Sequence, residues 1–163
     1  MPKASVREVS EAWEALFRSQ VSVMRELRKL PEFKELGMGE YDVLFNLSRC
    51  EDGSSRLGDL NEHLLISQPS LSRMAERLEA KGLVTREPDP EDQRAVLVSL
   101  SDAGRALQKH IGREHVQNIH RLLGDAMTPA QFRELTKLAR KISEALPRPP
   151  GTPPRRDVSG QRK

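Results

Sequence analysis

One glutamine, two serines and two arginines between positions 68 and 94 are the side chains of this 163-residue chain best suited to contacting DNA bases. Gln68 and Arg73 can each form two hydrogen bonds with a base edge, which discriminates against a wrong base by about 1–3 kcal/mol. Ser70 and Ser72 are small enough to let a helix approach the floor of a groove. Arg94 follows in a separate charged loop. The arrangement predicts a helix that enters the major groove and a loop that reaches the neighbouring minor groove.

Residues 67–81 must form the helix that positions the first group, because apolar side chains recur there at helical spacing. The apolar face carries Leu71, Met74, Ala75 and Leu78. The outward face carries Pro69, Ser72, Arg73, Glu76 and Arg77, with Ser70 at its flank. Ser67 is a suitable N-cap, and Gly82 suits the position just after the helix. This outward face is a candidate DNA contact, although any amphipathic surface helix has a polar outer face.

Two short strands joined by a charged loop are expected after this helix. Residues 83–86 and 95–100 have strand-like composition, and Arg86, at the end of the first, is a further candidate DNA contact. The loop between them contains four acidic residues, which would repel phosphate unless they are neutralised. Asp92 lies two residues before Arg94, so we expect its carboxylate to pair with the guanidinium and orient it. The alternative is a surface ion pair worth about 0–1 kcal/mol.

The rest of the chain predicts helices on both sides of this unit. Apolar residues at three- and four-residue steps indicate a long first helix that ends near Leu30-Pro31, then a second helix. The expected helix-starting residues are Ser54 or Ser55 for a short third helix, Ser101 for a long fifth helix and Thr128 for the last one. The outer helices carry more apolar surface than a small core can cover, so we expect a second copy to cover it.

Charge and composition indicate one domain with a basic tail. The net charge is +3, but residues 147–163 hold five basic residues and one acidic residue (+4), which leaves −1 for the other 146. DNA affinity must therefore come from individually placed arginines. The N-terminus lacks the apolar segment of a signal peptide. No apolar run approaches the roughly 18 residues that span a bilayer. We expect a cytoplasmic protein with no membrane partner.

Five short motifs in a fixed order resemble the MarR family of bacterial winged-helix transcriptional regulators. They are LGDL at 57–60, SQPSLSR at 67–73, LEAKGLVTR at 78–86, DPEDQR at 89–94 and VSLSDAG at 98–104. The motifs cover roughly residues 39–105. One departure is Gln93, which stands where the family often has a second arginine.

The resemblance implies a mainly α fold with a small β-hairpin wing, in which N- and C-terminal dimerisation helices flank a winged helix-turn-helix. The implied parts are a single domain at 1–146, with its DNA-binding lobe at about 39–100 and its dimerisation helices at about 5–30 and 101–146. The proline-rich, basic composition of residues 147–163 separately predicts a disordered tail. The family binds pseudo-palindromic operators in double-stranded DNA as a homodimer, usually as a repressor. It would place Arg94, supported by Asp92, in the minor groove and Ser70, Ser72 and Arg73 in the major groove.

Family members also often bind a small aromatic or anionic effector in a crevice between the dimerisation helices and the lobe. The candidates that the resemblance implies here are Trp13, Phe17, Tyr41, Phe45 and His115. Aromatic residues at helical spacing are more commonly core residues, and this remains the alternative.

Other kinds of site have little support. His110, His115 and His120 are five residues apart, an offset of about 140° on a helix, whereas helical metal ligands need three- or four-residue spacing. Cys50 lies beside two carboxylates, which disfavour a reactive thiolate. We find no paired catalytic carboxylates, glycine-rich phosphate loop or nucleophile motif, so we expect no enzyme, catalytic residue, metal or cofactor. The alternative to a DNA-binding regulator is a winged-helix protein-interaction module, which the acidic loop favours.

Overall fold

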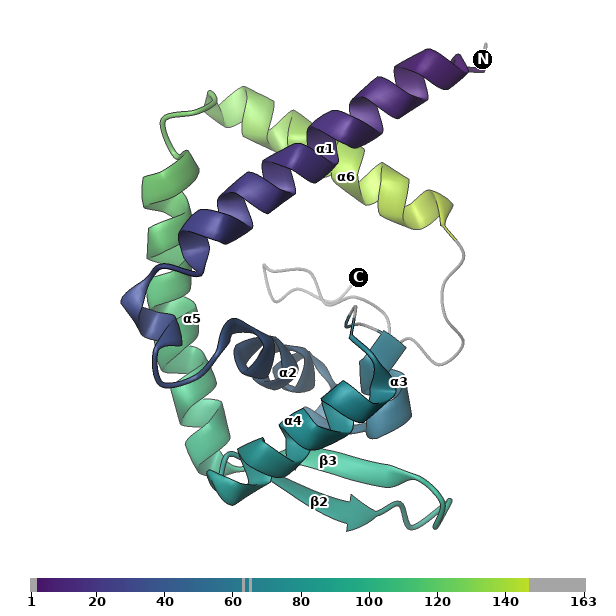
Figure 1. The fold of residues 1–163 in the computed structure, drawn as a ribbon, viewed down its shortest axis with the longest axis vertical. Helices are drawn as coiled ribbons and strands as arrows, with labels where there is room; N and C mark the ends of the chain where they lie inside the picture. Colours follow the sequence, from purple (N-terminus) through teal and green to yellow (C-terminus); the bar gives the residue numbers. More distant parts are fainter. Residues whose placement is uncertain (1–2, 63, 65, 147–163) are drawn as a thin grey trace.

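The computed structural model describes residues 3–62, 64 and 66–146 (Figure 1). Its helices are α1 (Val6–Leu27), α2 (Met38–Arg49), α3 (Leu57–Glu62), α4 (Gln68–Ala80), α5 (Asp102–Leu123) and α6 (Pro129–Ala145). Two short 3-10 helices are η1 (Pro31–Phe33) and η2 (Glu51–Gly53), and the strands are β1 (Ser54–Arg56), β2 (Val84–Pro88) and β3 (Val96–Leu100). The predicted mainly α fold with a β-hairpin wing is confirmed.

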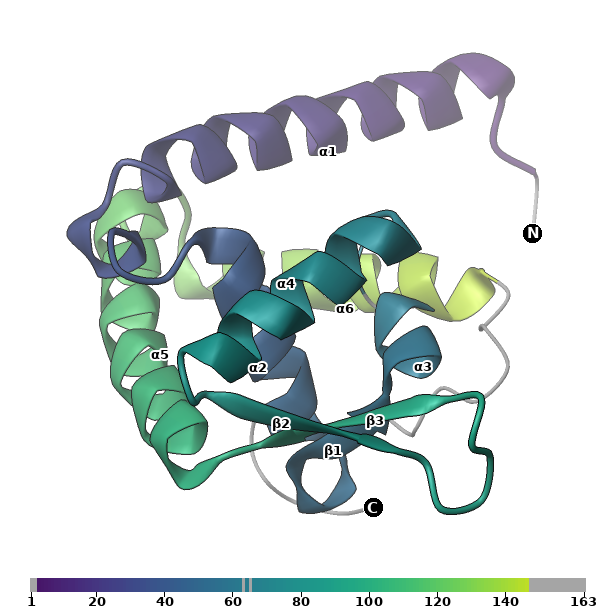
Figure 2. The same ribbon diagram turned by 60° about the horizontal axis from the view of Figure 1, so that its bottom comes forward.

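The three strands form one antiparallel sheet in the order β1–β3–β2. Strands β2 and β3 form the hairpin, with Val84 opposite Leu100 and Pro88 opposite Val96. Helices α2, α3 and α4 lie on one side of the sheet (Figure 2). We call this unit, residues 36–100, the lobe.

The hydrophobic core lies almost entirely in the lobe. Its buried members are Leu36, Tyr41, Val43, Leu44, Leu47, Leu57, Leu60, Leu71, Ala75, Leu78, Leu83, Val84, Val98 and Ile111. Only Ile111 comes from α5 in this set, and it attaches the middle of that helix to the lobe. The position of α5 relative to α4 and the wing is therefore set by core packing.

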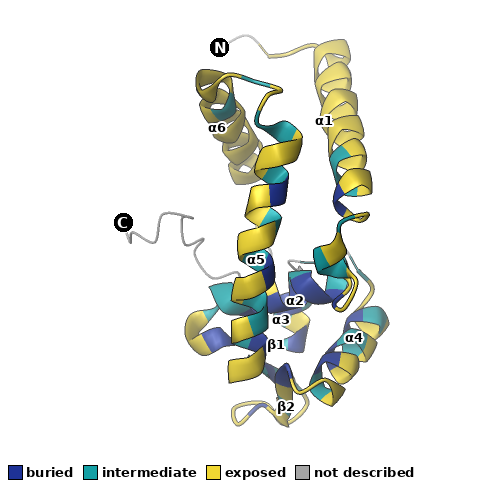
Figure 3. Ribbon diagram, turned by 90° about the vertical axis from the view of Figure 1, so that its left-hand side faces the viewer, coloured by how far each residue is buried: buried dark blue, intermediate teal, exposed yellow. Residues whose placement is uncertain are grey.

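Helices α1 and α6 lie at the other end of the molecule from the sheet and are mostly exposed (Figures 1 and 3). Each begins with a complete capping box, Ser5 with Glu8 and Thr128 with Gln131, and the second was predicted. Their exposed apolar residues are Val6, Val9, Trp13, Leu16, Phe17 and Val21 on α1, and Leu135, Leu138 and Ile142 on α6. Exposed apolar residues gathered along helices in this way are typical of an interface.

A tight junction joins α5 to the end of α4. The Ser101 hydroxyl accepts a hydrogen bond from the Gly104 N–H at 2.9 Å and donates one to the Gly82 carbonyl at 2.7 Å. The Ser101 N–H donates to the Leu83 carbonyl at 3.1 Å. Gly82 has φ +71°, which glycine adopts without strain, and a Cβ on Gly104 would lie 1.9 Å from the Leu83 oxygen. This junction fixes where α4 ends and the wing begins.

Two local predictions need correction. Ser54 and Ser55 lie in strand β1 and do not cap α3, because β1 pairs with β3 and the Ser54 hydroxyl bonds to that of Ser99 at 2.8 Å. Ser67 is the N-cap residue of α4 as predicted, but its hydroxyl donates to the Ser70 hydroxyl at 2.8 Å and does not cap the helix backbone.

The predicted disordered tail, residues 147–163, lies outside the described residues. Among the helices that the structure describes, none has both the length and the apolar character needed to cross a membrane.

Candidate DNA interface

Helix α4 presents a polar face to solvent while its opposite face is buried in the core. Leu71, Ala75 and Leu78 are buried, as the helical pattern predicts. The exposure of the predicted contact residues differs: Gln68, Pro69 and Arg73 are exposed, whereas Ser70 and Ser72 are half-buried. The Arg73 Nε donates to the Pro69 carbonyl at 3.3 Å, which holds the side chain along the first turn of its own helix. The first two turns of α4 thus offer a polar surface on a firmly packed helix.

A buried carboxylate at the start of α2 anchors the other end of α4. Glu40 is 8% exposed and bonds to Arg77 Nε at 3.3 Å and to Lys81 Nζ at 2.7 Å. Burial alone would raise the pKa of Glu40, but the hydrogen bonds and charges of Lys81 and Arg77 outweigh burial and lower that pKa. Arg77, predicted as a DNA contact, therefore has an ion-pair partner within the lobe.

Arg86 is also held within the lobe. Its Nε donates to Glu79 Oε2 at 2.9 Å, its backbone N–H donates to Glu79 Oε1 at 3.0 Å, and Nη1 lies 3.4 Å from Glu76 Oε1. The Arg86 hydrogen bond is the main reason that the pKa of Glu79 is lowered. Arg86 thus ties strand β2 to α4, and a DNA contact by it remains a prediction.

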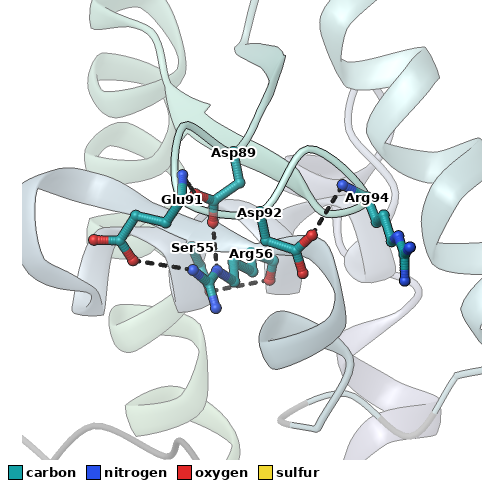
Figure 4. Close-up of polar contacts among 6 residues, drawn as sticks. All are labelled: Ser55, Arg56, Asp89, Glu91, Asp92 and Arg94. Atoms are coloured by element: carbon teal, nitrogen blue, oxygen red, sulfur yellow. Dashed lines mark hydrogen bonds and ion pairs between the residues drawn. The ribbon is translucent and has the colours of Figure 1, made fainter.

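The loop between β2 and β3, residues 89–95, forms the tip of the wing, and Arg94 on it is exposed. Asp92 does not pair with the Arg94 guanidinium as predicted. In the described structure its Oδ1 accepts a hydrogen bond from the Arg94 backbone N–H at 3.0 Å, and the Arg94 side chain extends away from it (Figure 4). A short side chain two residues ahead reaches a backbone N–H more easily than a guanidinium, as in other Asx turns. Asp92 therefore shapes the backbone at Arg94.

The acidic residues of the wing have a cationic partner that the sequence prediction missed. Arg56, the last residue of β1, forms ion pairs with Asp89 and with Glu91, the latter at 3.2 Å (Figure 4). Its hydrogen bond is the main cause of the lowered pKa of Asp89. Two of the four wing acids are thus neutralised. The sequence offered one signal for this contact, an acidic loop and an arginine, Arg56, to which no role had been assigned. The contact was missed because β1 has only three residues, too few for the alternating pattern by which a strand is recognised.

Similarity to known proteins identifies the family. The transcriptional regulator PecS of Dickeya dadantii is 30% identical over 124 residues, which cover 76% of this chain and 72% of PecS. A family model described as the MarR family matches residues 36–95.

The chain belongs to the MarR family.

The multiple antibiotic resistance protein MarR of Escherichia coli is 33% identical over 84 residues, 52% of this chain. The chain thus matches 58% of the length of that relative. A mutant of E. coli MarR, in which one cysteine is replaced by serine, has a crystal structure in complex with operator DNA. This structure matches the chain with a TM-score of 0.69 and 25% sequence identity, and the match covers 86% of this chain and 99% of that one. The winged-helix fold is therefore shared with MarR-family proteins over most of the described chain.

The candidate effector residues fall into two groups. Tyr41, Phe45 and His115 gather around Tyr41, whose ring centroid lies 6.1 Å from that of Phe45 and 5.7 Å from that of His115. Trp13 and Phe17 stack on each other at 6.2 Å on the exposed side of α1. Phe33, which the sequence analysis did not name, joins the first group, because its ring lies 5.2 Å from that of His115. Helical spacing shows which residues share one face of a helix, but it does not show which other segment packs against that face. The sequence analysis therefore placed these two separate groups in one candidate site.

The remaining candidates have ordinary surroundings in the structure. Cys50 is half-buried, its Sγ donates to the Asn46 carbonyl at 3.4 Å, and burial is the main cause of its raised pKa, which disfavours a thiolate. His110 lies 3.6 Å from Glu114 on the same helix. Within residues 3–62, 64 and 66–146, no cluster of three or more histidine, cysteine or carboxylate side chains is placed to hold a metal ion. His63 lies outside the described residues.

Proposed function

We propose that this MarR-family chain is a sequence-specific transcriptional regulator that binds double-stranded DNA through α4 and the wing. The observation that carries the proposal is the exposed polar surface on the first turns of α4, on a helix buried along its other face, together with exposed Arg94 on the wing. A helix of this kind fits a major groove, and an arginine at a hairpin tip suits a minor groove. The E. coli MarR mutant that shares this fold was solved with operator DNA, which supports DNA binding by this chain.

The proposal includes a homodimer that binds a pseudo-palindromic operator and represses transcription from it. The support is the apolar surface on α1 and α6, where Trp13 is 64% exposed and Ile142 52% exposed. A second copy that covers this surface would present two α4 helices to DNA, so the two half-sites would be related by a twofold axis.

The proposal also includes release by a small aromatic or anionic effector bound near Tyr41 and His115. Their rings, with that of Phe33, form an aromatic cluster between α2, η1 and α5. The buried Nδ1 of His115 has no hydrogen-bond partner among the described residues, and a ligand could bond to it. Trp13 and Phe17, in contrast, fit the dimer surface better.

Arg94→Ala tests the DNA-binding part of the proposal. A labelled duplex enriched by the wild-type chain from a random library serves as the probe, and fluorescence anisotropy gives Kd. We expect binding about fivefold to a hundredfold weaker, because one arginine contact is worth about 1–3 kcal/mol. Arg133→Ala, an exposed arginine on α6 at the other end of the molecule, is the matched control and should bind as the wild type does.

Unchanged affinity of the Arg94→Ala variant would refute the role of the wing. If the library yields no retained duplex at all, the winged-helix protein-interaction module becomes the better interpretation. An enriched sequence without dyad symmetry would refute the dimeric mode while leaving DNA binding in place.

A further inference from the structure

Arg56 connects strand β1 to a loop more than 30 residues further along the chain. It is the last residue of β1, opposite Leu97 of β3, and the next residue begins α3. Its Nε donates to Asp89 Oδ2 and its Nη2 donates to Glu91 Oε2 at 3.2 Å, so one guanidinium contacts two carboxylates of the wing (Figure 4). The guanidinium thus fixes two points of the loop relative to the body of the lobe.

Asp89 also forms hydrogen bonds with the backbone of the loop, so it links Arg56 to that backbone. Asp89 is 5% exposed, and its Oδ1 accepts a hydrogen bond from the Glu91 N–H at 2.7 Å. Its own N–H donates to the Ala95 carbonyl at 3.0 Å, and the Ala95 N–H donates to the Asp92 carbonyl at 2.8 Å. Asp92 in turn accepts the Arg94 N–H at 3.0 Å. An unbroken series of hydrogen bonds therefore runs from Arg56 to the backbone of Arg94.

The Glu91 half of this contact has little value as a simple stabiliser of the fold, whereas the Asp89 half also gives a buried carboxylate its partner. The Arg56 side chain is 39% exposed and that of Glu91 is 86% exposed, and ion pairs open to solvent are weak. What the contact changes is the geometry of the loop, because a loop of this length without anchors would sample many conformations. We therefore expect the contact to strengthen DNA binding, because a loop that is already ordered does not lose conformational entropy when it binds.

We infer that Arg56 is a positioning residue for the wing, which holds the loop 89–95 against β1 so that Arg94 meets DNA in a fixed place. This inference rests on the proposed function, in which Arg94 contacts DNA. Arg56 acts through Arg94, and its own guanidinium points into the loop and is occupied by Asp89 and Glu91 (Figure 4).

A double-mutant cycle between positions 56 and 94 tests the inference with the full chain and the enriched duplex. We expect Arg56→Gln to weaken binding about fivefold to tenfold when Arg94 is present and less than about twofold in the Arg94→Ala background, because coupled residues are non-additive. Arg56→Lys, which keeps the charge, should recover part of the loss. The matched control is Arg105→Gln, since Arg105 is also half-buried and contacts the Asp52 carbonyl of η2. It should bind as the wild type does.

A second variant separates positioning from charge. Removing both charges with Arg56→Gln and Asp89→Asn restores the net charge of the loop but not the anchor, so binding should stay weak. Recovery of wild-type affinity would overturn the inference, because charge compensation alone would then explain the effect of Arg56. The inference would also be overturned if Arg56→Gln reduced DNA affinity equally with and without Arg94, or did not reduce it at all. An equal reduction of affinity by Arg105→Gln would overturn it as well. If Arg94→Ala has no effect by itself, the proposed function fails instead.

Discussion

Replacing Gly104 with alanine tests the junction between α5 and the end of α4. A Cβ at this position would lie 1.9 Å from the carbonyl oxygen of Leu83, whereas ordinary van der Waals contact begins at 3.4 Å. The two backbones would have to separate by at least 1.1 Å (3.0 − 1.9) to remove the clash, and by 1.5 Å (3.4 − 1.9) to reach ordinary contact. Neither partner is a flexible side chain that can move aside, so α5 itself must shift.

The free-energy cost can be worked from these contacts. Overpacking of this kind costs about 1–3 kcal/mol. The shift would also strain the hydrogen bonds from Ser101 to Leu83 and Gly82, at about 1 kcal/mol each. The higher helix propensity of alanine offsets about 1 kcal/mol of this loss. The net loss of folding stability is about 2–4 kcal/mol, which corresponds to a melting temperature lower by roughly 5–15 °C for a chain of this size.

Thermal unfolding followed by circular dichroism at one fixed protein concentration measures this loss. Gly58→Ala is the matched control, because Gly58 also lies in a helix and a Cβ there would meet no atom within 4 Å. Its stability should be unchanged or higher by up to about 1 kcal/mol. If Gly104→Ala melts together with the wild type and the control, the close approach of α5 to Leu83 is refuted.

Three further outcomes are expected. Because the pKa of Glu40 is lowered in the folded chain, its contribution to stability is complete above its ordinary value of 4.5 and is lost as the pH falls through the lowered value. Denaturant titrations at several pH values should show the stability advantage of wild type over Glu40→Gln shrinking below pH 4.5, and a pH-independent difference would contradict this. Arg73→Ala should weaken binding to the enriched duplex more than to random DNA, and equal losses in anisotropy titrations would argue against base contact. Ile142→Asp should shift the mass measured by sedimentation from dimer to monomer, while Arg133→Ala should not, and a dimer in both would exclude α6 from the interface.

Features fixed by neighbouring residues were predictable from the sequence. The capping box of Thr128 and Gln131, the N-cap at Ser101 and the left-handed Gly82 after α4 depend on contacts within a few residues, and the structure has all three. The buried face of α4 was predictable for the same reason, since helical periodicity alone determines it.

Contacts between distant segments were not predictable. Glu40 bonds to Lys81 41 residues later, and Arg56 bonds to Asp89 33 residues later, so no local spacing relates these partners. Strand β1 was missed because its three residues acquire strand geometry only by pairing with β3. The expected pairing of Asp92 with the Arg94 guanidinium failed because sequence proximity does not say which atom of a neighbour is reached.

The contrast between the lobe and the outer helices has a consequence for local unfolding. Within Pro129–Ala145 no residue is buried, and within Val6–Leu27 only Leu27 is, whereas α2 contributes five buried residues. In an isolated chain, the amide protons of α6 would exchange with solvent through low-energy opening, while those of α2 would exchange only when the lobe unfolds. Slow hydrogen exchange in α6 would therefore report association of two chains, and slow exchange in α2 would report folding of each one.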